Sequence, residues 1–206
     1  MIVRKMDMDK YVITISRQFA SMGRTIAQEM AKELGIEFYD RDIVESTAKR
    51  MQLAVSHISE AEEKAGSIFA SRKYPLGMGL NSMQDEIFRV QSNIIRDLAK
   101  TESCIIVGRC ADSILRDEKR CLNIYVYAPY EARLKNCTEL LGMDKRTAVK
   151  MIREVDKARE AYRLRYCKGV KGVMDHRDIM IDSSKFGPER TAQILCGVVR
   201  QVFEQV

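Results

Sequence analysis

The sequence has no tryptophan, only three prolines and 7% aromatic residues among its 206 residues. It also lacks any apolar run close to the ~20 residues that a membrane-spanning helix needs. Its six cysteines stand singly, without a Cys-x-x-Cys pair, which argues against zinc and against a disulfide framework. The first ten residues lack the apolar core of a signal peptide. We therefore expect a cytoplasmic protein with no membrane partner.

The charge balance narrows the class of partner. Charged residues make up 31% of the chain and the formal net charge is +6, which suits an anion such as nucleic acid or nucleotide. However, the basic residues are interleaved with acidic ones, whereas a nucleic-acid-binding protein more often carries a one-sided basic stripe. The charge favours a phosphorylated small molecule and no nucleic-acid partner, although by itself it decides nothing.

The most informative pattern lies at residues 11–34. An apolar run at 11–15 is followed by a turn at 16–22, and Gly23 then begins an amphipathic segment with apolar residues at helical spacing. A strand, a turn and a helix in this order are typical of a phosphate-binding loop. The unpaired amides of the first helical turn and the positive end of the helix dipole both favour an anion there.

This loop departs from the standard motif, G-x-x-x-x-G-K followed by serine or threonine, in which lysine reaches the outer phosphates and the hydroxyl holds magnesium. Gln18 replaces the first glycine and Arg24 replaces the lysine, while Gly23 and Thr25 stay in register. Arginine keeps a permanent charge and can bind phosphate through two nitrogens, although it is bulkier and more rigid than lysine. The alternative is an ordinary strand–helix turn with a solvated arginine.

Apolar strands and helices alternate along the rest of the chain. Strands are expected at 36–39, 103–107, 121–127 and 179–181, and helices at 43–51, 54–70, 82–99, 111–115, 130–141 and 188–203. Asp144 can cap one more helix. This alternation predicts an α/β fold with a five-stranded parallel sheet and right-handed crossovers. Because the carboxyl ends of parallel strands share one edge, the loop, Asp40-Arg41 and Gly108-Arg109 should converge. For Asp40-Arg41, the alternative is that Asp40 or Asp42 simply caps the helix that follows.

Two segments stand apart from the alternation. Residues of about 53–90 have the weakest core pattern, and we expect a helical insert that covers the substrate or makes a dimer contact. Residues of about 144–168 form an unusually basic helix. Most of its charges fit a solvated, salt-bridged face. The alternative is a lid that closes Arg153, Lys157 and Arg159 over transferring phosphates.

These residues resemble the cytidylate kinase-like family of bacterial proteins. The resemblance runs over nearly the whole chain and lies in ITISRQF at 13–19, SMGR at 21–24, FYDR at 38–41, VGR at 107–109 and IDSS at 181–184. That family is similar in turn to the cytidylate kinases, P-loop kinases that transfer the γ-phosphate of ATP to CMP or dCMP. The resemblance implies a single three-layer P-loop kinase domain over residues 1–206, with a monophosphate-binding insert and an arginine-bearing lid.

The resemblance also implies a role for each candidate residue. The ATP phosphates would be held by Ser21, Met22, Gly23, Arg24 and Thr25, with Thr25 also holding Mg²⁺. The acceptor would be bound by Asp40, Arg41, Gly108 and Arg109. The catalytic cations would be Arg24, Arg109, Arg153, Lys157 and Arg159. Asp182 and Ser183 would lie near the nucleotide base.

Two departures from the family pattern bear on activity. Cys110 stands where cytidylate kinases have an aspartate, and the glycine of many relatives is absent near Ala20. Asp112 lies nearby but should point elsewhere on its helix. The leading interpretation is an ATP- and Mg²⁺-dependent kinase for a nucleoside monophosphate, with CMP or dCMP first. The alternatives are a nucleotide-binding regulatory protein without turnover and a kinase for another small molecule. The long central helices also suggest a homodimer.

Overall fold

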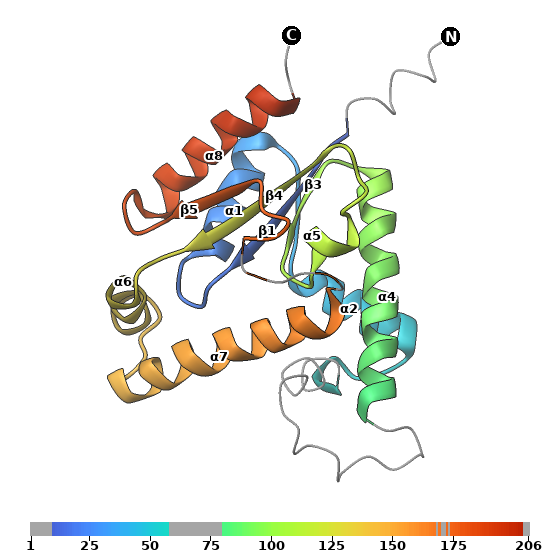
Figure 1. Ribbon diagram of the computed structural model, residues 1–206, viewed down its shortest axis with the longest axis horizontal. Helices are drawn as coiled ribbons and strands as arrows, with labels where there is room; N and C mark the ends of the chain where they lie inside the picture. The colour runs from blue at the N-terminus through green and yellow to red at the C-terminus, as the bar shows by residue number, and fades with distance from the viewer. Residues whose placement is uncertain (1–9, 58–79, 168, 170–171, 173, 204–206) are drawn as a thin grey trace.

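The computed structural model describes residues 10–57, 80–167, 169, 172 and 174–203. One sheet contains all five strands, in parallel and in the order β2-β3-β1-β4-β5. The strands are β1 (Val12–Arg17), β2 (Glu37–Tyr39), β3 (Cys104–Val107), β4 (Cys121–Tyr127) and β5 (Ile179–Asp182). The predicted five-stranded parallel sheet is therefore confirmed, and the first strand in sequence is the central one (Figure 1).

Helices cover both faces of this sheet (Figure 1). On one face, α1 (Gly23–Leu34) packs against α8 (Gly187–Phe203), and on the other, α4 (Leu80–Thr101) packs against α5 (Ala111–Ile114) and α2 (Arg41–Met51). The remaining helices are α6 (Tyr130–Lys135), the π-helix η1 (Asn136–Leu140) and α7 (Lys145–Tyr166). Within the described ranges, no helix combines the length and the apolar character needed to cross a bilayer.

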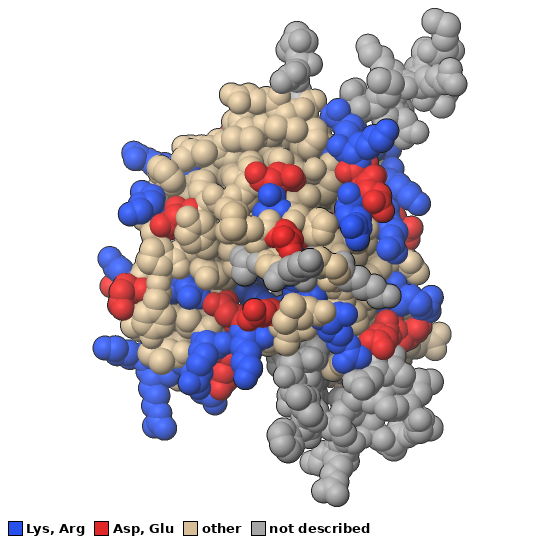
Figure 2. All heavy atoms as spheres, viewed as in Figure 1, with Lys and Arg blue, Asp and Glu red and all other residues tan. Residues whose placement is uncertain are grey.

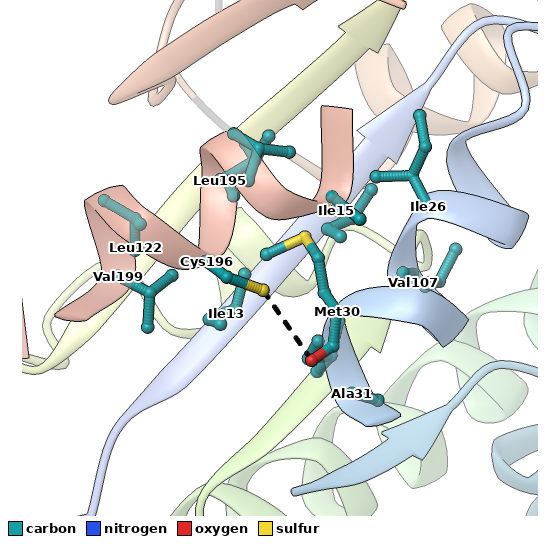
Figure 3. Close-up of a cluster of buried hydrophobic side chains, with 14 of the residues drawn as sticks. Ile13, Ile15, Ile26, Met30, Ala31, Val107, Leu122, Leu195, Cys196 and Val199 are labelled. Atoms are coloured by element: carbon teal, nitrogen blue, oxygen red, sulfur yellow. Dashed lines mark hydrogen bonds between the residues drawn. The ribbon is translucent and has the colours of Figure 1, made fainter. Parts of the chain in front are cut away.

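Strand β1 shows why its sequence is continuously apolar rather than alternating. Ile13 and Ile15 face α1 and α8, while Val12 faces α4 and α5, so both sides of the strand are buried. Figure 3 shows Ile13 and Ile15 beside Met30 of α1 and Leu195 of α8. Each such side chain contributes about 1.5–3 kcal/mol through its burial. This core holds the carboxyl end of β1 in a defined position.

The buried cysteines belong to this core. Cys104 and Cys196 are fully buried and Cys121 is half-buried. The Cys196 thiol donates to the carbonyl of Met30, with Sγ 3.9 Å from the oxygen (Figure 3). Burial raises the pKa of both Cys104 and Cys196 to about 12. These thiols are therefore protonated packing groups rather than nucleophiles.

One predicted helix differs from the observed structure, and another lies mostly outside the described residues. The helix expected at 130–141 is α6 followed by the wider η1 turn, which brings the side chain of Asn136 to the β1–α1 loop, 2.8 Å from the carbonyl oxygen of Ala20. Most of the helix expected at 54–70, and most of the expected insert at 53–90, lies outside the described residues. As expected, Asp144 caps α7, because its carboxylate accepts from the Thr147 amide at 3.0 Å.

Candidate active site

The β1–α1 loop contains backbone conformations that usually require glycine, yet the residues that adopt them have side chains. Ala20 and Met22 both lie in the left-handed region, with φ of 58° and 60°. Met22 is the N-cap residue of α1, and no side chain caps that helix. The first amides of α1 therefore have no side-chain acceptor at the cap, which suits an anion.

Replacing Met22 with glycine should raise the free energy of unfolding by about 0.5–1 kcal/mol. A side chain in the left-handed region costs about 1 kcal/mol, and the greater entropy of glycine in the unfolded chain offsets part of that gain. Urea titration measures the change. Gln28→Gly is the matched control, because Gln28 is exposed in the middle of α1 and glycine in a helix interior should cost about 1 kcal/mol. If Met22→Gly lowers the free energy of unfolding as much as the control substitution does, the strain argument is wrong.

Hydrogen bonds to the end of β4 and to the residue after β5 hold the loop in place. The Gln18 side-chain oxygen accepts from the Ala128 amide at 3.1 Å, which explains how glutamine serves where the motif has glycine. The Ser21 hydroxyl donates to the carbonyl of Val126 at 3.1 Å, and the Ser183 hydroxyl donates to the carbonyl of Ser21 at 2.7 Å. In the structure, Ser21 and Ser183 thus fix the loop backbone, and their contact with ATP stays a prediction.

A second brace joins the loop to α7. The Asp156 carboxylate accepts from the Phe19 amide at 2.7 Å and forms an ion pair with Arg133 of α6. Arg133 also lies 3.4 Å from the carbonyl oxygen of Phe19. Helix α7 is therefore attached directly to the candidate phosphate-binding loop rather than standing away from it.

Four arginines gather around Asp40, the residue that follows β2. Arg24 Nε lies 3.2 Å from Asp40 Oδ2, and Arg17 Nη2 lies 3.8 Å from Oδ1. Arg109 Nε lies 3.5 Å from the carbonyl oxygen of Asp40. Arg159 of α7 donates to the carbonyl of Arg17 at 3.1 Å. The ends of β1, β2 and β3 thus converge as predicted, and they do so with α1 and α7 beside them.

Among the described residues, two carboxylates act on these four arginines, Asp40 and, beside Arg159, Asp156, so positive charge is in excess. Burial lowers the pKa of Arg17 to about 9, with further lowering by Arg159, Arg109 and Arg24, while Asp40 acts in the opposite direction. Burial also lowers the pKa of Arg159. Arginines remain charged at neutral pH, so the cations of this cluster repel one another. A bound anion would relieve that repulsion. A phosphoryl group matches both the charge and the donor geometry of guanidinium groups.

Asp40 does not play the capping role that was the alternative for it. It stands at the N-cap position of α2, but its side chain makes no capping hydrogen bond. The carboxylate turns instead toward Arg24 and Arg17. Arg41 was predicted to bind the acceptor, and its side chain lies outside the described part of the structure.

The sequence prediction missed Arg17. Its side chain is 19% exposed and runs through a slot made by two glycines. A Cβ atom on Gly23 would lie 2.7 Å from the Cβ of Arg17, and one on Gly108 would lie 2.2 Å from its Nη1. The available signal was its position, because a cation directly at the carboxyl end of the central strand lies at the ligand-binding edge of such sheets.

The segment after β3 is conformationally unusual. Gly108, Arg109 and Cys110 all have positive φ, at 80°, 54° and 54°. Each non-glycine residue in this region costs about 1 kcal/mol or more, and such strain concentrates at functional sites. Here the left-handed turn directs Arg109 back toward Asp40 and places Gly108 against Arg17.

Helix α7 brings one of its three predicted lid cations to the site. Arg159 reaches the loop, whereas Arg153 and Lys157 are exposed. The physical reason is helical periodicity, because Arg153 and Lys157 share a face that Arg159 does not share. Where Figure 1 places α7, Figure 2 shows Lys and Arg side chains among Asp and Glu, as expected of a solvated surface. A role for Arg153 and Lys157 over phosphates stays a prediction.

Asp112 anchors the other half of α7. It is buried, and its Oδ2 lies 2.6 Å from Nη1 of Arg163 and 2.7 Å from Nη1 of Arg177. Its pairing with Arg163 and Arg177 was not foreseen from the sequence. The carboxylate connects α5, α7 and the segment before β5, so it fixes where the α7 arginines can reach.

Thr25 lies at a surface pocket beside the loop. The pocket has a volume of about 290 Å³ and is lined by Thr25 and Glu29 of α1 and by residues 186–190 at the start of α8, including Phe186 and Pro188. Asp182, predicted to lie near the base, accepts from the Ser184 amide at 2.9 Å and so shapes the turn that leads to this pocket.

A magnesium ion would find few protein ligands here. In the described parts of the chain, no three His, Cys, Asp or Glu side chains gather as a metal site. Thr25 offers one hydroxyl, and the nearby Asp40 carboxylate is paired with Arg24. This donor set fits an ion that is coordinated mainly by phosphate oxygens and water, which is the usual way that Mg²⁺ binds with nucleotides.

Comparison with known proteins agrees with this geometry. Residues 12–185 match the sequence profile of the cytidylate kinase-like family. No protein with a curated description matches the chain.

Several solved structures share the fold. An uncharacterized protein from Eubacterium ventriosum is 24% identical, with a TM-score of 0.70. The matched region covers 92% of this chain and 98% of that protein's chain. A shikimate kinase from Acinetobacter baumannii, in complex with shikimate, is 12% identical, with a TM-score of 0.54, covering 96% and 97%. A sugar kinase from Janibacter is 16% identical, with a TM-score of 0.53, covering 91% and 93%. At these identities the likeness concerns the fold.

Proposed function

Because the chain belongs to the cytidylate kinase-like family, we propose that it transfers a phosphoryl group from ATP to a nucleoside monophosphate, with CMP or dCMP as the leading acceptors. The observation that carries this proposal is the group of four arginines around Asp40, where three strand ends meet the start of α1. Family membership supports the general class, a small-molecule kinase. The acceptor and the use of ATP and Mg²⁺ belong to the proposal.

The side chains have distinct roles in this mechanism. The first amides of α1 hold the phosphates of ATP, Arg24 adds positive charge beside them, and Arg109 holds the phosphate of the acceptor. Asp40 keeps Arg24 oriented, because the pair is 3.2 Å apart. Thr25 would hold Mg²⁺ on the protein side, and the ion would supply further positive charge to the phosphates. No side chain becomes covalently modified, since phosphoryl transfer needs chiefly alignment and positive charge.

Cys110 favours a second candidate, a kinase for another small molecule. Cytidylate kinases have an aspartate at this place, and a carboxylate there can orient a nucleotide. The Cys110 thiol is buried, and its hydrogen bond with Cys167 is the first cause that raises its pKa. It therefore stays neutral and cannot replace a carboxylate. Shikimate and sugar kinases, whose structures share this fold, act on hydroxylated acceptors according to their names.

The test is ADP release from ATP and Mg²⁺ with each of CMP, dCMP, UMP, AMP and GMP, and with hydroxylated acceptors such as shikimate. Blanks without acceptor measure background hydrolysis. Release that depends on a pyrimidine monophosphate would support the leading proposal, and release with a hydroxylated acceptor would support the second. A thermal shift with ATP but no release with any acceptor would favour a nucleotide-binding protein without turnover.

Arg24→Lys should retain turnover within about threefold of the unmodified protein, or raise it. Lysine restores the standard motif and keeps the charge beside Asp40. The measurement is the turnover number with saturating ATP and the best acceptor. Arg96→Lys, an exposed arginine on α4, is the matched control. An inactive Arg24→Lys protein would show that the loop depends on a guanidinium at this position.

A further inference from the structure

The Arg17 side chain is more enclosed by the protein than the Arg24 side chain. The Arg17 side chain is 19% exposed, whereas the Arg24 side chain is 47% exposed. Gly23, at the start of α1, and Gly108, at the end of β3, leave the space in which the Arg17 side chain lies. Gly23 belongs to the predicted donor loop and Gly108 to the predicted acceptor segment. The Arg17 side chain therefore runs from the predicted donor loop, where its Cβ lies against Gly23, to the predicted acceptor segment, where its guanidinium lies against Gly108.

A simple structural ion pair does not account for this placement. Asp40 is closer to Arg24, at 3.2 Å, than to Arg17, at 3.8 Å. One carboxylate charge can neutralise only one of these cations. Burying a second guanidinium costs free energy unless an anion compensates it. The loop is in addition held by Gln18, Ser21 and Asp156, so it does not need the Arg17 side chain as a brace.

We propose that Arg17 holds the transferring phosphoryl group, which is the part that lysine plays in the standard loop motif. This proposal rests on the proposed kinase function and identifies which cation serves it. During transfer, an acceptor oxygen forms a bond to phosphorus and the bond from phosphorus to the bridging oxygen breaks. That oxygen leaves on ADP with the electron pair. Arg17 donates hydrogen bonds to the equatorial oxygens of the group and is chemically unchanged.

In this proposal Arg24 contributes less to phosphate binding than Arg17 does. It is half exposed and paired with Asp40, so solvent and the carboxylate both weaken its field at a phosphate. A buried, pre-positioned cation acts in a lower dielectric and needs no reorganisation when the group arrives. The departure from lysine at position 24 is therefore compensated by Arg17 rather than by Arg24 itself.

Inorganic tripolyphosphate tests this proposal by isothermal titration calorimetry at fixed ionic strength, because it carries the phosphate chain of ATP but no nucleoside. Arg17→Gln should weaken its binding by about 10- to 100-fold, as expected for a lost charge-assisted hydrogen bond. Arg24→Gln should weaken it by less than about threefold, and Arg17→Lys should fall between the two. Arg96→Gln, which changes an exposed arginine on α4, should leave binding unchanged.

The proposal is overturned if Arg17→Gln binds tripolyphosphate within about threefold of the unmodified protein, if Arg24→Gln loses more, or if the unmodified protein does not bind it. If Arg17→Gln does not fold, Arg17→Lys decides, because it keeps the charge and loses the guanidinium. Binding that depends on Arg17 without ADP release for any acceptor would support Arg17 as the phosphate-holding cation while refuting the kinase reaction. The two failures are thus distinguishable.

Discussion

Replacing Asp112 with asparagine is expected to lower the free energy of unfolding by about 3–5 kcal/mol, because a buried ion pair loses one partner. The Asp112 carboxylate is buried and pairs with Arg163 and Arg177 at 2.6 and 2.7 Å. The Arg177 side chain is only 2% exposed, so water cannot replace the lost charge. Burial already lowers the pKa of Arg177, against the effect of Asp112.

Urea unfolding followed by circular dichroism measures this loss. Asp97→Asn is the matched control, because Asp97 forms an exposed ion pair with Arg50 at 3.4 Å, and exposed pairs contribute about 0–1 kcal/mol. A loss below about 1 kcal/mol for Asp112→Asn would show that Asp112 does not stabilise this part of the fold. Because the carboxylate also anchors α7, the variant should release Arg159 from the loop and weaken tripolyphosphate binding.

Arg109→Ala should lower kcat/KM for the acceptor by about 10³-fold while ATP affinity stays within about threefold. Arg109 is held by a left-handed backbone turn and directed to Asp40, on the side of the cluster that we assign to the acceptor. Removing a pre-positioned cation or donor at a transferring phosphoryl group typically costs 10²–10⁵-fold in rate. The loss should appear chiefly with the acceptor, because the α1 amides and the other arginines remain.

Initial rates at varied acceptor concentration, with ATP binding measured separately by calorimetry, separate the two effects. Arg146→Ala is the control, since Arg146 is an exposed arginine in the first turn of α7. An equal loss of ATP affinity would contradict the assignment of Arg109 to the acceptor. Unchanged kcat/KM for Arg109→Ala would remove it from the site altogether.

The proposed roles of Arg17 and Arg24 also explain how a loop that departs from the standard motif could bind phosphate. Gln18 replaces the first glycine without loss of the turn because its side chain bonds to the end of β4. Ala20 and Met22 accept left-handed geometry at a cost in strain. Gly23 is retained where a side chain would strike Arg17. Of the two motif residues that remain, Gly23 is the one that the position of Arg17 requires.

The fold and the location of the site could be predicted from the sequence for one physical reason. Strand and helix periodicities are local, and parallel strands joined by helices must place their carboxyl ends at one edge. Asp40, Arg109 and the β1–α1 loop converge because of this topology, and it needs no knowledge of side-chain contacts. Family resemblance, now matched over residues 12–185, pointed to the same edge.

Side-chain direction and pairing depended on tertiary structure. Arg159 faces the loop while Arg153 and Lys157 face solvent, because α7 is rotated by its contacts with the loop and with Asp112. The partners involved are distant in sequence: 142 positions separate Arg159 from Arg17, and 51 separate Arg163 from Asp112. Local patterns carry no information on such contacts. The sequence alone therefore determined at which edge of the sheet the candidate phosphate site lies, and only the packed structure decided which arginines face it.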